Sequence, residues 1–426
     1  MVSEVLAHPW IEPAANAVRR LALHQLRASW RGGRLDLVMP TGETVRIGDA
    51  GTGETRARIG EGRAFVGDAG PAARISDAGP AEARAYLHDD RVFLRLALRG
   101  ELGAGESFVA GEWSSDDLVG LLRVALRATA ARGVESPLTR IAQLPALVRY
   151  RRRRDRAERN VHAHYDLGNR FYRLFLDETL TYSCAIWPSP NMSLADAQRA
   201  KLDRMCDWLE LAPRDHLLEI GCGWGSMAIH AAKTRGCRVT AITLSREQHE
   251  LASARVAAEG LADRVAVQYR DYRDVTGRFD KIVSIEMLEQ VGDAHLPTFF
   301  ATCARALAPG GLLAVQTITM PDDRFETYRR RVDWMQTYVF PGTLIPSLAA
   351  IRAACAPLSI ARSDDIGPDY APTLRAWRER YVAALPDVRA LGFDTRFIRT
   401  WLLYLAFSEA AFSERTLGDH QLLFVR

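Results

Sequence analysis

The spacing of hydrophobic residues changes near residue 160. Before that point, one helical pattern at 14–30 precedes short strand-like runs that glycines interrupt, at 34–40, 44–48, 64–67 and 91–100. Further on, Ser114 is suited to cap a helix that starts near residue 115. These patterns predict a small α+β domain over residues 1–130. We interpret residues 131–160 as a linker that becomes helical and strongly basic.

After residue 160, continuous apolar runs alternate with helical patterns such as 245–260. Alternation of this kind indicates a doubly wound, mostly parallel sheet in an α/β domain, here residues 161–426. The segment 321–356 is too long for a simple loop, so we expect it to insert helices over the carboxyl edge of the sheet, where ligands bind in such folds. The seven predicted strands are 217–221, 238–243, 264–269, 279–285, 311–319, 357–366 and 420–426.

The composition is that of a globular protein. The chain has 426 residues, of which 48% are apolar, and a net charge of +4. No apolar run reaches the ~20 residues needed to cross a bilayer, and the first residues lack the apolar core of a signal peptide. Six cysteines lie far apart with no CxxC pair, which argues against a disulfide framework and against a zinc site. We therefore expect free thiols, no bound metal and a cytoplasmic location.

A glycine-rich loop follows the first predicted strand of the larger domain. In 219-EIGCGWG-225, glycines at 221, 223 and 225 allow the backbone to approach a ligand, and Glu219 precedes them. The pattern E-x-G-x-G-x-G resembles a class I S-adenosylmethionine-dependent methyltransferase; the alternative is a NAD-binding sheet. Both classes usually carry an acid at the end of the second strand, where this chain has Thr243 within 243-TLSREQ-248.

Longer motifs resemble the cyclopropane-fatty-acyl-phospholipid synthases and their mycolic-acid relatives. The resemblance covers almost the whole chain and implies a class I methyltransferase fold with helical lid insertions. It also implies that the amino-terminal domain is sterol-carrier-like and helps to engage lipid. The motifs are 162-HAHYDLGNRFYRLFLDETLTYSCAIW-187, 219-EIGCGWG-225, 243-TLSREQ-248, 286-EMLEQVG-292, 338-YVFPGTLIPS-347, 367-GPDYAPTLRAWRER-380 and 404-YLAFSEAAF-412.

The resemblance implies a reaction on lipid. The π electrons of a cis double bond in a phospholipid acyl chain attack the sulfonium methyl, a bound bicarbonate removes a proton from the added methyl, and a ring closes. Around that anion, Cys184 and Ile318 would offer backbone groups and Tyr370 its phenol. Glu289 would hold the bicarbonate hydroxyl, which requires a proton on one partner. The alternative for Glu289 is an acid on a helix surface.

Two glutamines depart from the family pattern. Gln290 replaces the histidine of EHVG, and Gln316 in VQTIT replaces a histidine that contacts the bicarbonate in better-known synthases. Glutamine can donate a hydrogen bond but carries no positive charge. We therefore expect weaker anion binding or another base. Ring formation stays the first expectation; relatives with QxIT can instead form methylene- or methyl-branched chains.

Cys184 has three possible roles: nucleophile, metal ligand or pocket wall. A nucleophile needs an activating partner and a suitable electrophile, and His162 and His164 form no zinc pattern. We favour the pocket wall, with the backbone amide as the useful group. The resemblance assigns the cofactor site to Tyr182, Ser183, Glu219, Gly221, Gly223, Gly225, Thr243, Leu244, Gln248, Tyr272 and Arg273.

A cluster of seven arginines and two acids lies between Arg149 and Arg159. It accompanies no nucleic-acid motif, and the alternative is a solvated helix face. Anionic headgroups suit an enzyme acting on phospholipids, so we predict peripheral binding to the inner leaflet, and a homodimer from the resemblance alone. Alternative functions are a small-molecule N-methyltransferase and a non-catalytic lipid-binding protein.

Overall fold

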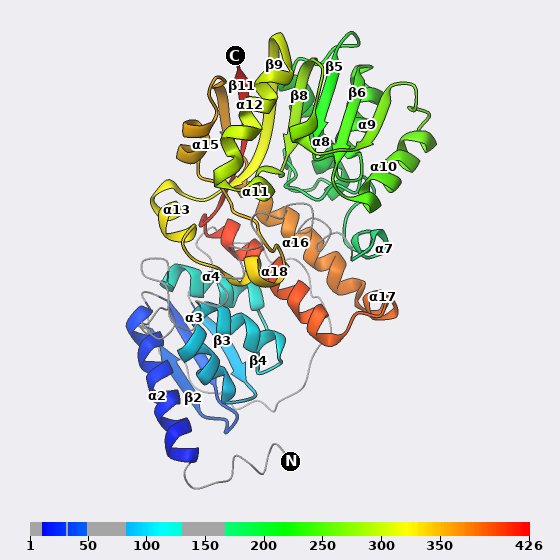
Figure 1. Cartoon of the computed structure of the whole chain (residues 1–426). Helices are drawn as coiled ribbons and strands as arrows, with labels where there is room; N and C mark the ends of the chain where they lie inside the picture. Colours follow the sequence, from blue (N-terminus) through cyan, green and yellow to red (C-terminus); the bar gives the residue numbers. More distant parts are fainter. Residues whose placement is uncertain (1–10, 31–32, 49–81, 130–166) are drawn as a thin grey trace. The chain divides into compact units, whose positions relative to one another are not determined.

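A computed structural model of the chain describes residues 11–30, 33–48, 82–129 and 167–426. The chain divides into two compact units, Met1–Thr139 and Arg140–Arg426, which are described separately and shown in Figure 1. The strand expected at 64–67, the two histidines at 162 and 164, and the arginine cluster at 149–159 lie outside the described residues.

The amino-terminal unit contains a four-stranded sheet in the order β2-β1-β3-β4. β1 runs antiparallel to β2 and parallel to β3. The strand β3 was not predicted, because its sequence EARAYL has only weak alternation. The elements are α2 (Ile11–Ser29), β1 (Arg34–Val38), β2 (Thr44–Ile47), β3 (Glu82–Leu87), α3 (Arg91–Val109), β4 (Trp113–Ser114) and α4 (Leu118–Thr129).

Two expectations for this unit are wrong. Residues 91–100 begin a helix rather than a strand, because their arginines recur every four residues and gather on one helical face. Ser114 does not cap a helix; it lies in β4, and its hydroxyl contacts His88 Nε2 at 2.8 Å. The helix α4 starts three residues later than expected, and Asp117 accepts the Gly120 amide at 2.8 Å.

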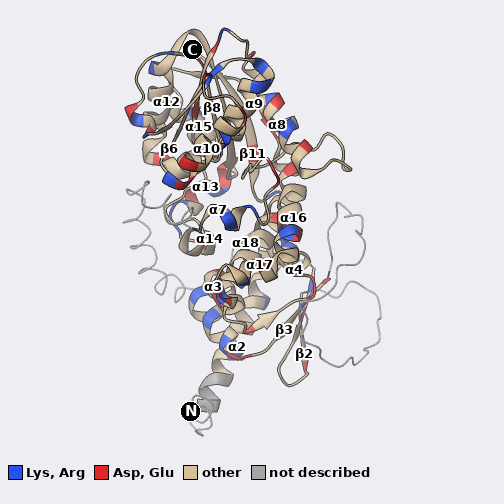
Figure 2. Cartoon of the chain, turned by 90° about the vertical axis from the view of Figure 1, so that its right-hand side faces the viewer, with Lys and Arg blue, Asp and Glu red and all other residues tan. Residues whose placement is uncertain are grey.

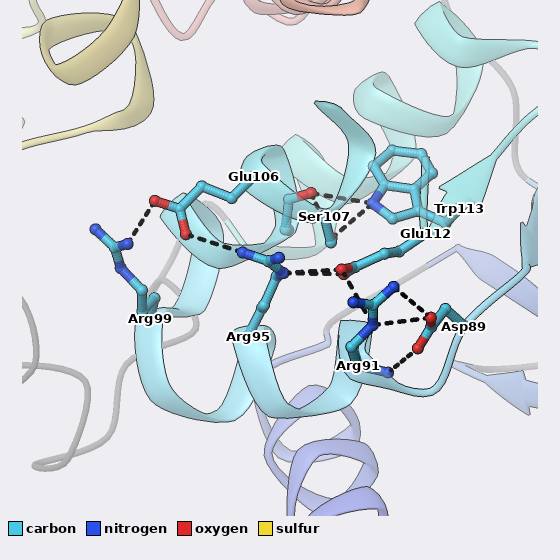
Figure 3. Close-up of polar contacts among 9 residues, drawn as sticks. Asp89, Arg91, Arg95, Arg99, Glu106, Ser107, Glu112 and Trp113 are labelled. Carbon is cyan, nitrogen blue, oxygen red and sulfur yellow. Dashed lines mark hydrogen bonds and ion pairs between the residues drawn. The ribbon is translucent and has the colours of Figure 1, made fainter. Parts of the chain in front are cut away.

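The arginines of α3 bind buried acids, as Figure 3 shows. Glu112 has a side chain only 1% exposed and accepts two hydrogen bonds from Arg95 Nε, at 3.0 and 3.1 Å. One turn further along, Arg99 pairs with Glu106 at 2.6 Å. Since a buried carboxylate is costly without partners, the Arg95–Glu112 pair holds the turn after α3 against the helix, and the Arg99–Glu106 pair joins the two parts of α3 on either side of Gly100.

The carboxy-terminal unit is built on a seven-stranded sheet in the order β10-β11-β9-β8-β5-β6-β7. Only β11 runs antiparallel to its neighbours, so the sheet is mostly parallel, as predicted. All seven predicted strands are found, as β5 (His216–Ile220), β6 (Arg238–Thr243), β7 (Val265–Tyr269), β8 (Phe279–Ile285), β9 (Leu307–Thr319), β10 (Ser359–Asp365) and β11 (Gly418–Val425).

Helices cover both faces of this sheet (Figure 1). Successive strand residues enter opposite cores: Leu217 packs with α8, α9 and α10, while Leu218 packs with α12 and α15. On the outer surfaces, positive and negative residues are interspersed along the helices, as Figure 2 shows. The helices are α8 (Leu194–Trp208), α9 (Ser226–Arg235), α10 (Arg246–Ala258), α12 (Leu296–Ala306) and α15 (Leu348–Ala354).

The remaining helices gather at the end of the sheet where β8 leads into α11 (Figure 1). The insertion 321–356 does form helices, and its Leu344 amide donates to the Glu289 backbone carbonyl at 2.8 Å. Its last helix, α15, packs on a sheet face against α12 instead. The group comprises α7 (Asn169–Tyr172), α11 (Leu288–Val291), α13 (Asp322–Tyr328), α14 (Trp334–Tyr338), α16 (Gly367–Ala383), α17 (Leu385–Ala390) and α18 (Thr395–Ser413).

Aromatic side chains hold these helices together. Phe171 is fully buried and touches six other rings edge-on or tilted, including Tyr381 and Trp401. Such contacts contribute about 0.5–1.5 kcal/mol each beyond their buried area. Most aromatics of the 171–187 segment therefore act as core. Over the described ranges, no helix is long and apolar enough to cross a membrane.

Candidate active site

A pocket lies at the carboxyl ends of β5, β6 and β8. Gly223 has φ 51°, and a side chain there would meet no atom within 4 Å, so the loop leaves room for a ligand against its backbone. Gly225 instead caps α9 and faces Ala252, 3.2 Å from an added Cβ. Ten of the eleven expected cofactor residues line the pocket: Tyr182, Ser183, Glu219, Gly221, Gly223, Thr243, Leu244, Gln248, Tyr272 and Arg273.

Glu219 gives this pocket a buried acid. Its side chain is buried, and within the described residues its Oε2 has no hydrogen-bond partner. Burial raises the pKa of Glu219 to about 8. A cationic group bound in the pocket would satisfy this oxygen and favour the charged form. S-adenosylmethionine carries an ammonium and a sulfonium, so the residues present fit that cofactor.

The 243-TLSREQ-248 motif forms the pocket wall at the end of β6, where methyltransferases and NAD-binding proteins usually carry an acid. The Thr243 hydroxyl donates to Gln248 Oε1 at 2.8 Å and accepts the Ser245 amide at 3.1 Å. Ser245 caps α10 by accepting the Gln248 amide at 3.2 Å. After the next strand, β7, Arg273 donates two hydrogen bonds to the Asp271 carboxylate, at 2.9 and 2.6 Å. The neutral Thr243–Gln248 pair thus takes the structural place of the carboxylate.

Beside the pocket, three chain segments converge on one carboxylate, Glu286. Its Oε1 accepts the Cys184 amide at 2.7 Å and Gln316 Nε2 at 2.9 Å, and its Oε2 accepts the Tyr370 hydroxyl at 2.6 Å. Glu286 directly follows β8 and also lines the cofactor pocket. We call Glu286 with these three donors the carboxylate cup.

Glu289 lies at the edge of the cup and is buried, not on a helix surface. Its Oε1 accepts the Ile318 amide at 2.6 Å and the Thr317 hydroxyl at 2.9 Å. Burial, together with the nearby charge of Glu286, raises the pKa of Glu289 to about 8. At neutral pH this carboxyl group is therefore mostly protonated.

A bound bicarbonate does not fit this arrangement. Each donor that the resemblance assigns to the anion already binds a carboxylate of the chain. The amide of Cys184, the amide group of Gln316 and the phenol of Tyr370 donate to Glu286, and the Ile318 amide donates to Glu289. An anion added here would find none of these four donors free and would lie beside the Glu286 carboxylate, which repels it.

The Cys184 thiol is fully buried and lies near the backbone carbonyl oxygens of Ala185 and Ile366, at 3.2 and 3.7 Å. Burial raises the pKa of Cys184 well above its usual range, and Asp419 and Glu286 add to this effect. A protonated thiol is a poor nucleophile. In the part of the chain that the structure describes, no cluster suited to a metal includes it or any other residue. Its amide is the group that enters the cup.

Three site residues were missed from the sequence: Glu286, Asp419 and Lys201. Asp419 is fully buried, and Gln316 Nε2 lies 3.3 Å from its Oδ2. Burial and the charge of Glu286 raise the pKa of Asp419 well above its usual range. Lys201 is also fully buried and donates to Ser183 at 2.5 Å, and burial lowers its pKa.

Only Glu286 had a usable sequence signal: an acid directly after a buried strand, at the edge where ligands bind. Lys201 and Asp419 lie in no recognisable motif. β11 pairs with β9 and brings Asp419 opposite Ile318.

The sheet topology, the glycine loop and the pocket define a class I S-adenosylmethionine-dependent methyltransferase. The family model described as mycolic acid cyclopropane synthetase matches residues 152–422. The chain belongs to this family.

Among curated relatives, a tuberculostearic acid methyltransferase of Mycobacterium tuberculosis is 42% identical over 345 residues, covering 78% of this chain and 80% of that protein. The cyclopropane-fatty-acyl-phospholipid synthase of Escherichia coli is 36% identical over 342 residues, covering 78% of this chain and 85% of that protein.

Solved structures agree with this assignment. A mycolic acid cyclopropane synthase complexed with S-adenosylhomocysteine and CTAB superposes with a TM-score of 0.60 at 30% identity, covering 63% of this chain and 98% of that one. The cyclopropane synthase MmaA2 from Mycobacterium tuberculosis also gives a TM-score of 0.60, at 28% identity, with coverage of 63% and 98%.

Proposed function

We propose that this enzyme transfers the methyl group of S-adenosylmethionine to a cis double bond in a phospholipid acyl chain. Family membership supports a lipid substrate, as do two relatives named for fatty-acyl phospholipid and for tuberculostearic acid. When bound, the cofactor supplies an electrophilic methyl group. The residues of the chain must then orient the alkene, exclude water and receive a proton.

The carboxylate cup is the observation that carries the proposal. Methylation of an alkene leaves a carbocation that must lose a proton from carbon, which needs a base held close to the reacting atoms. A methylated amine loses its proton to water without such a base. A carboxylate that lines the cofactor pocket and is held by three donors therefore suits carbon methylation better than N-methylation.

Aromatic rings on the pocket wall suit a cationic intermediate. The Tyr182 hydroxyl is bound to the Tyr404 hydroxyl at 2.8 Å, and Trp224 Nε1 donates to Asn169 at 2.7 Å. Both Tyr182 and Trp224 line the pocket. Ring faces stabilise a nearby cation by about 0.5–2 kcal/mol. Orientation of the alkene against the methyl group can contribute up to roughly 7–11 kcal/mol.

Two products follow from one cation. Loss of a proton from the added methyl closes a cyclopropane ring; after a hydride shift, the same loss gives a methylene branch. We propose ring closure first, because the family and the Escherichia coli relative are named for it. The neutral Gln316, in place of the histidine expected for ring-forming relatives, favours the branched product.

We also propose that the enzyme works peripherally at a membrane, because its substrate is a membrane lipid. The candidate surface is the arginine cluster at 149–159, where each arginine would contribute about 1 kcal/mol near anionic headgroups. Co-sedimentation with anionic vesicles tests this with Arg151, Arg152, Arg153 and Arg154 changed to serine. We expect weaker, salt-sensitive binding; unchanged binding would refute the contact.

Lipid mass spectrometry tests the proposed function. The chain is expressed in a bacterium that lacks its own synthase, beside the variant Gly221→Val. That control blocks the cofactor loop, because an added Cβ would lie 2.8 Å from Met287 and φ is 83°. We expect each unsaturated acyl chain to gain the mass of one CH₂ group with the unaltered enzyme only. Unchanged acyl chains, with a folded enzyme that binds the cofactor, would contradict the proposal.

A further inference from the structure

We propose that Glu286 is the catalytic base, taking the place of the bound bicarbonate expected from the resemblance. The inference rests on the proposed function and deepens it. A carboxylate and a bicarbonate both present two oxygens on a planar carbon. In this chain, the donors expected to hold the external anion hold the Glu286 side chain instead, at 2.6–2.9 Å.

The backbone at Glu286 supports a functional role. Its φ is 48°, in the left-handed region that glycine adopts most easily. Residues held in such conformations carry backbone strain and cluster at active sites. A glycine would remove this strain, yet the chain has a charged residue here. The strained backbone directs the carboxylate between the Cys184 amide and the Tyr370 hydroxyl.

Two further acids and a buried lysine surround Glu286. Burial is the main cause that raises the pKa of both Asp419 and Glu289, the latter to about 8, so both tend to hold a proton. The buried amine of Lys201 interacts favourably with Glu286 and Asp419. Three hydrogen-bond donors stabilise the charged form of Glu286 itself.

The proposed step balances in atoms and charge. The alkene electron pair forms a bond to the methyl carbon, and the carbon–sulfur bond breaks with its electrons on sulfur. Glu286 Oε then takes a proton from the carbon skeleton and becomes a carboxylic acid. The electrons of the broken C–H bond form either the last ring bond or a double bond. The proton afterwards leaves Glu286 to solvent, so no oxidant, reductant or dissolved bicarbonate is consumed.

Three enzymes and one control test the proposal. The enzymes are the wild type, Glu286→Gln, which keeps the size of the side chain, and Glu286→Gly, which suits φ 48° and empties the cup. The control is Glu259→Gln, which changes an exposed acid that pairs with Lys233 at the surface. Methyl transfer to unsaturated phosphatidylglycerol vesicles is measured in buffer freed of carbon dioxide, with and without added bicarbonate. Cofactor binding is followed by calorimetry.

We expect wild-type and Glu259→Gln rates that do not respond to bicarbonate. Glu286→Gln should lose about 100-fold or more of the rate, the usual range for a lost general base, while it still binds S-adenosylhomocysteine. Bicarbonate should not rescue this variant, because the amide still fills the cup. Glu286→Gly should be slow in depleted buffer and regain activity with bicarbonate.

A readout independent of activity uses carbon-13 bicarbonate. Its NMR signal should broaden with Glu286→Gly and not with the wild type. A wild-type enzyme that binds or requires bicarbonate would overturn the proposal. So would a Glu286→Gln variant that keeps more than about a tenth of the rate, or a Glu286→Gly variant that bicarbonate does not rescue. A wild-type enzyme that binds cofactor but methylates no lipid would instead overturn the proposed function beneath it.

Discussion

Replacing Glu289 with glutamine should change how the stability of the enzyme depends on pH. Glutamine keeps an Oε1 that can accept from the Ile318 amide and the Thr317 hydroxyl. It also removes the ionisable carboxyl group at this position. The pKa of Glu289 is about 8 in the folded protein, against an ordinary value of 4.5. The folded state therefore binds more protons than the unfolded state between these two values.

The sign follows from proton linkage. Because the folded pKa is the higher one, the contribution of Glu289 is most favourable below the unfolded pKa and is lost as pH rises through the folded value. A full shift of this size corresponds to roughly 5 kcal/mol, at 1.36 kcal/mol per pKa unit. Relaxation of the buried site reduces that figure, so we expect about 2–3 kcal/mol between pH 6 and pH 9.

Urea unfolding of both proteins, followed by tryptophan fluorescence at several pH values in this range, measures the effect. The difference in unfolding free energy, glutamine variant minus wild type, should rise steadily with pH. A constant offset would come from the unpartnered amide hydrogens and does not bear on the argument. A difference that stays flat across the range would refute the assignment of a raised pKa to Glu289.

Three further predictions concern the cofactor, the cup and the amino-terminal unit. Glu219→Gln should weaken S-adenosylmethionine binding about 10-fold or more, because a charge-assisted contact worth about 1.5–3 kcal/mol is lost. Calorimetry measures this affinity, and an unchanged affinity would show that Glu219 does not contact the cofactor. Tyr370→Phe removes the 2.6 Å donor to Glu286 and should lower kcat about 10- to 100-fold with unchanged cofactor affinity, and an unchanged kcat would contradict the role of the cup. Arg95→Met leaves the buried Glu112 without its Nε donor and should destabilise the amino-terminal unit by about 1–3 kcal/mol. Limited proteolysis should then cleave that unit faster than in the wild type. An equal rate of cleavage would contradict a stabilising role for the Arg95–Glu112 pair.

Strands β5, β6, β8 and β9 could be predicted because each contains an apolar run with buried residues on both faces. The edge strand β10 is polar and mostly exposed. The stretch 91–100 misled because its apolar residues fit a strand as well as a helix. The spacing of Arg91, Arg95 and Arg99 was the better signal, since each pairs with an acid near one helical face. Helix formation was decided by these tertiary partners, which the local pattern does not contain.

The sequence predicted that residues of several local motifs meet in one pocket, and ten of the eleven expected cofactor residues line it. The carboxylate cup could be predicted only in part. Cys184, Gln316 and Tyr370 lie in recognisable motifs, yet the group they bind, Glu286, was given no role by the resemblance. Asp419 reaches the site through the pairing of β11 with β9, a contact between distant segments. Its burial and partners follow only from the folded chain.

The most direct test of the proposed reaction uses S-adenosylmethionine with a fully deuterated methyl group and vesicles of a phospholipid with one cis double bond per acyl chain. We predict that the label enters the acyl chain with two of its three deuterium atoms, because the base removes one from the added methyl. A saturated phospholipid should stay unlabelled. Label in the headgroup, or no transfer by an enzyme that binds the cofactor, would contradict the account.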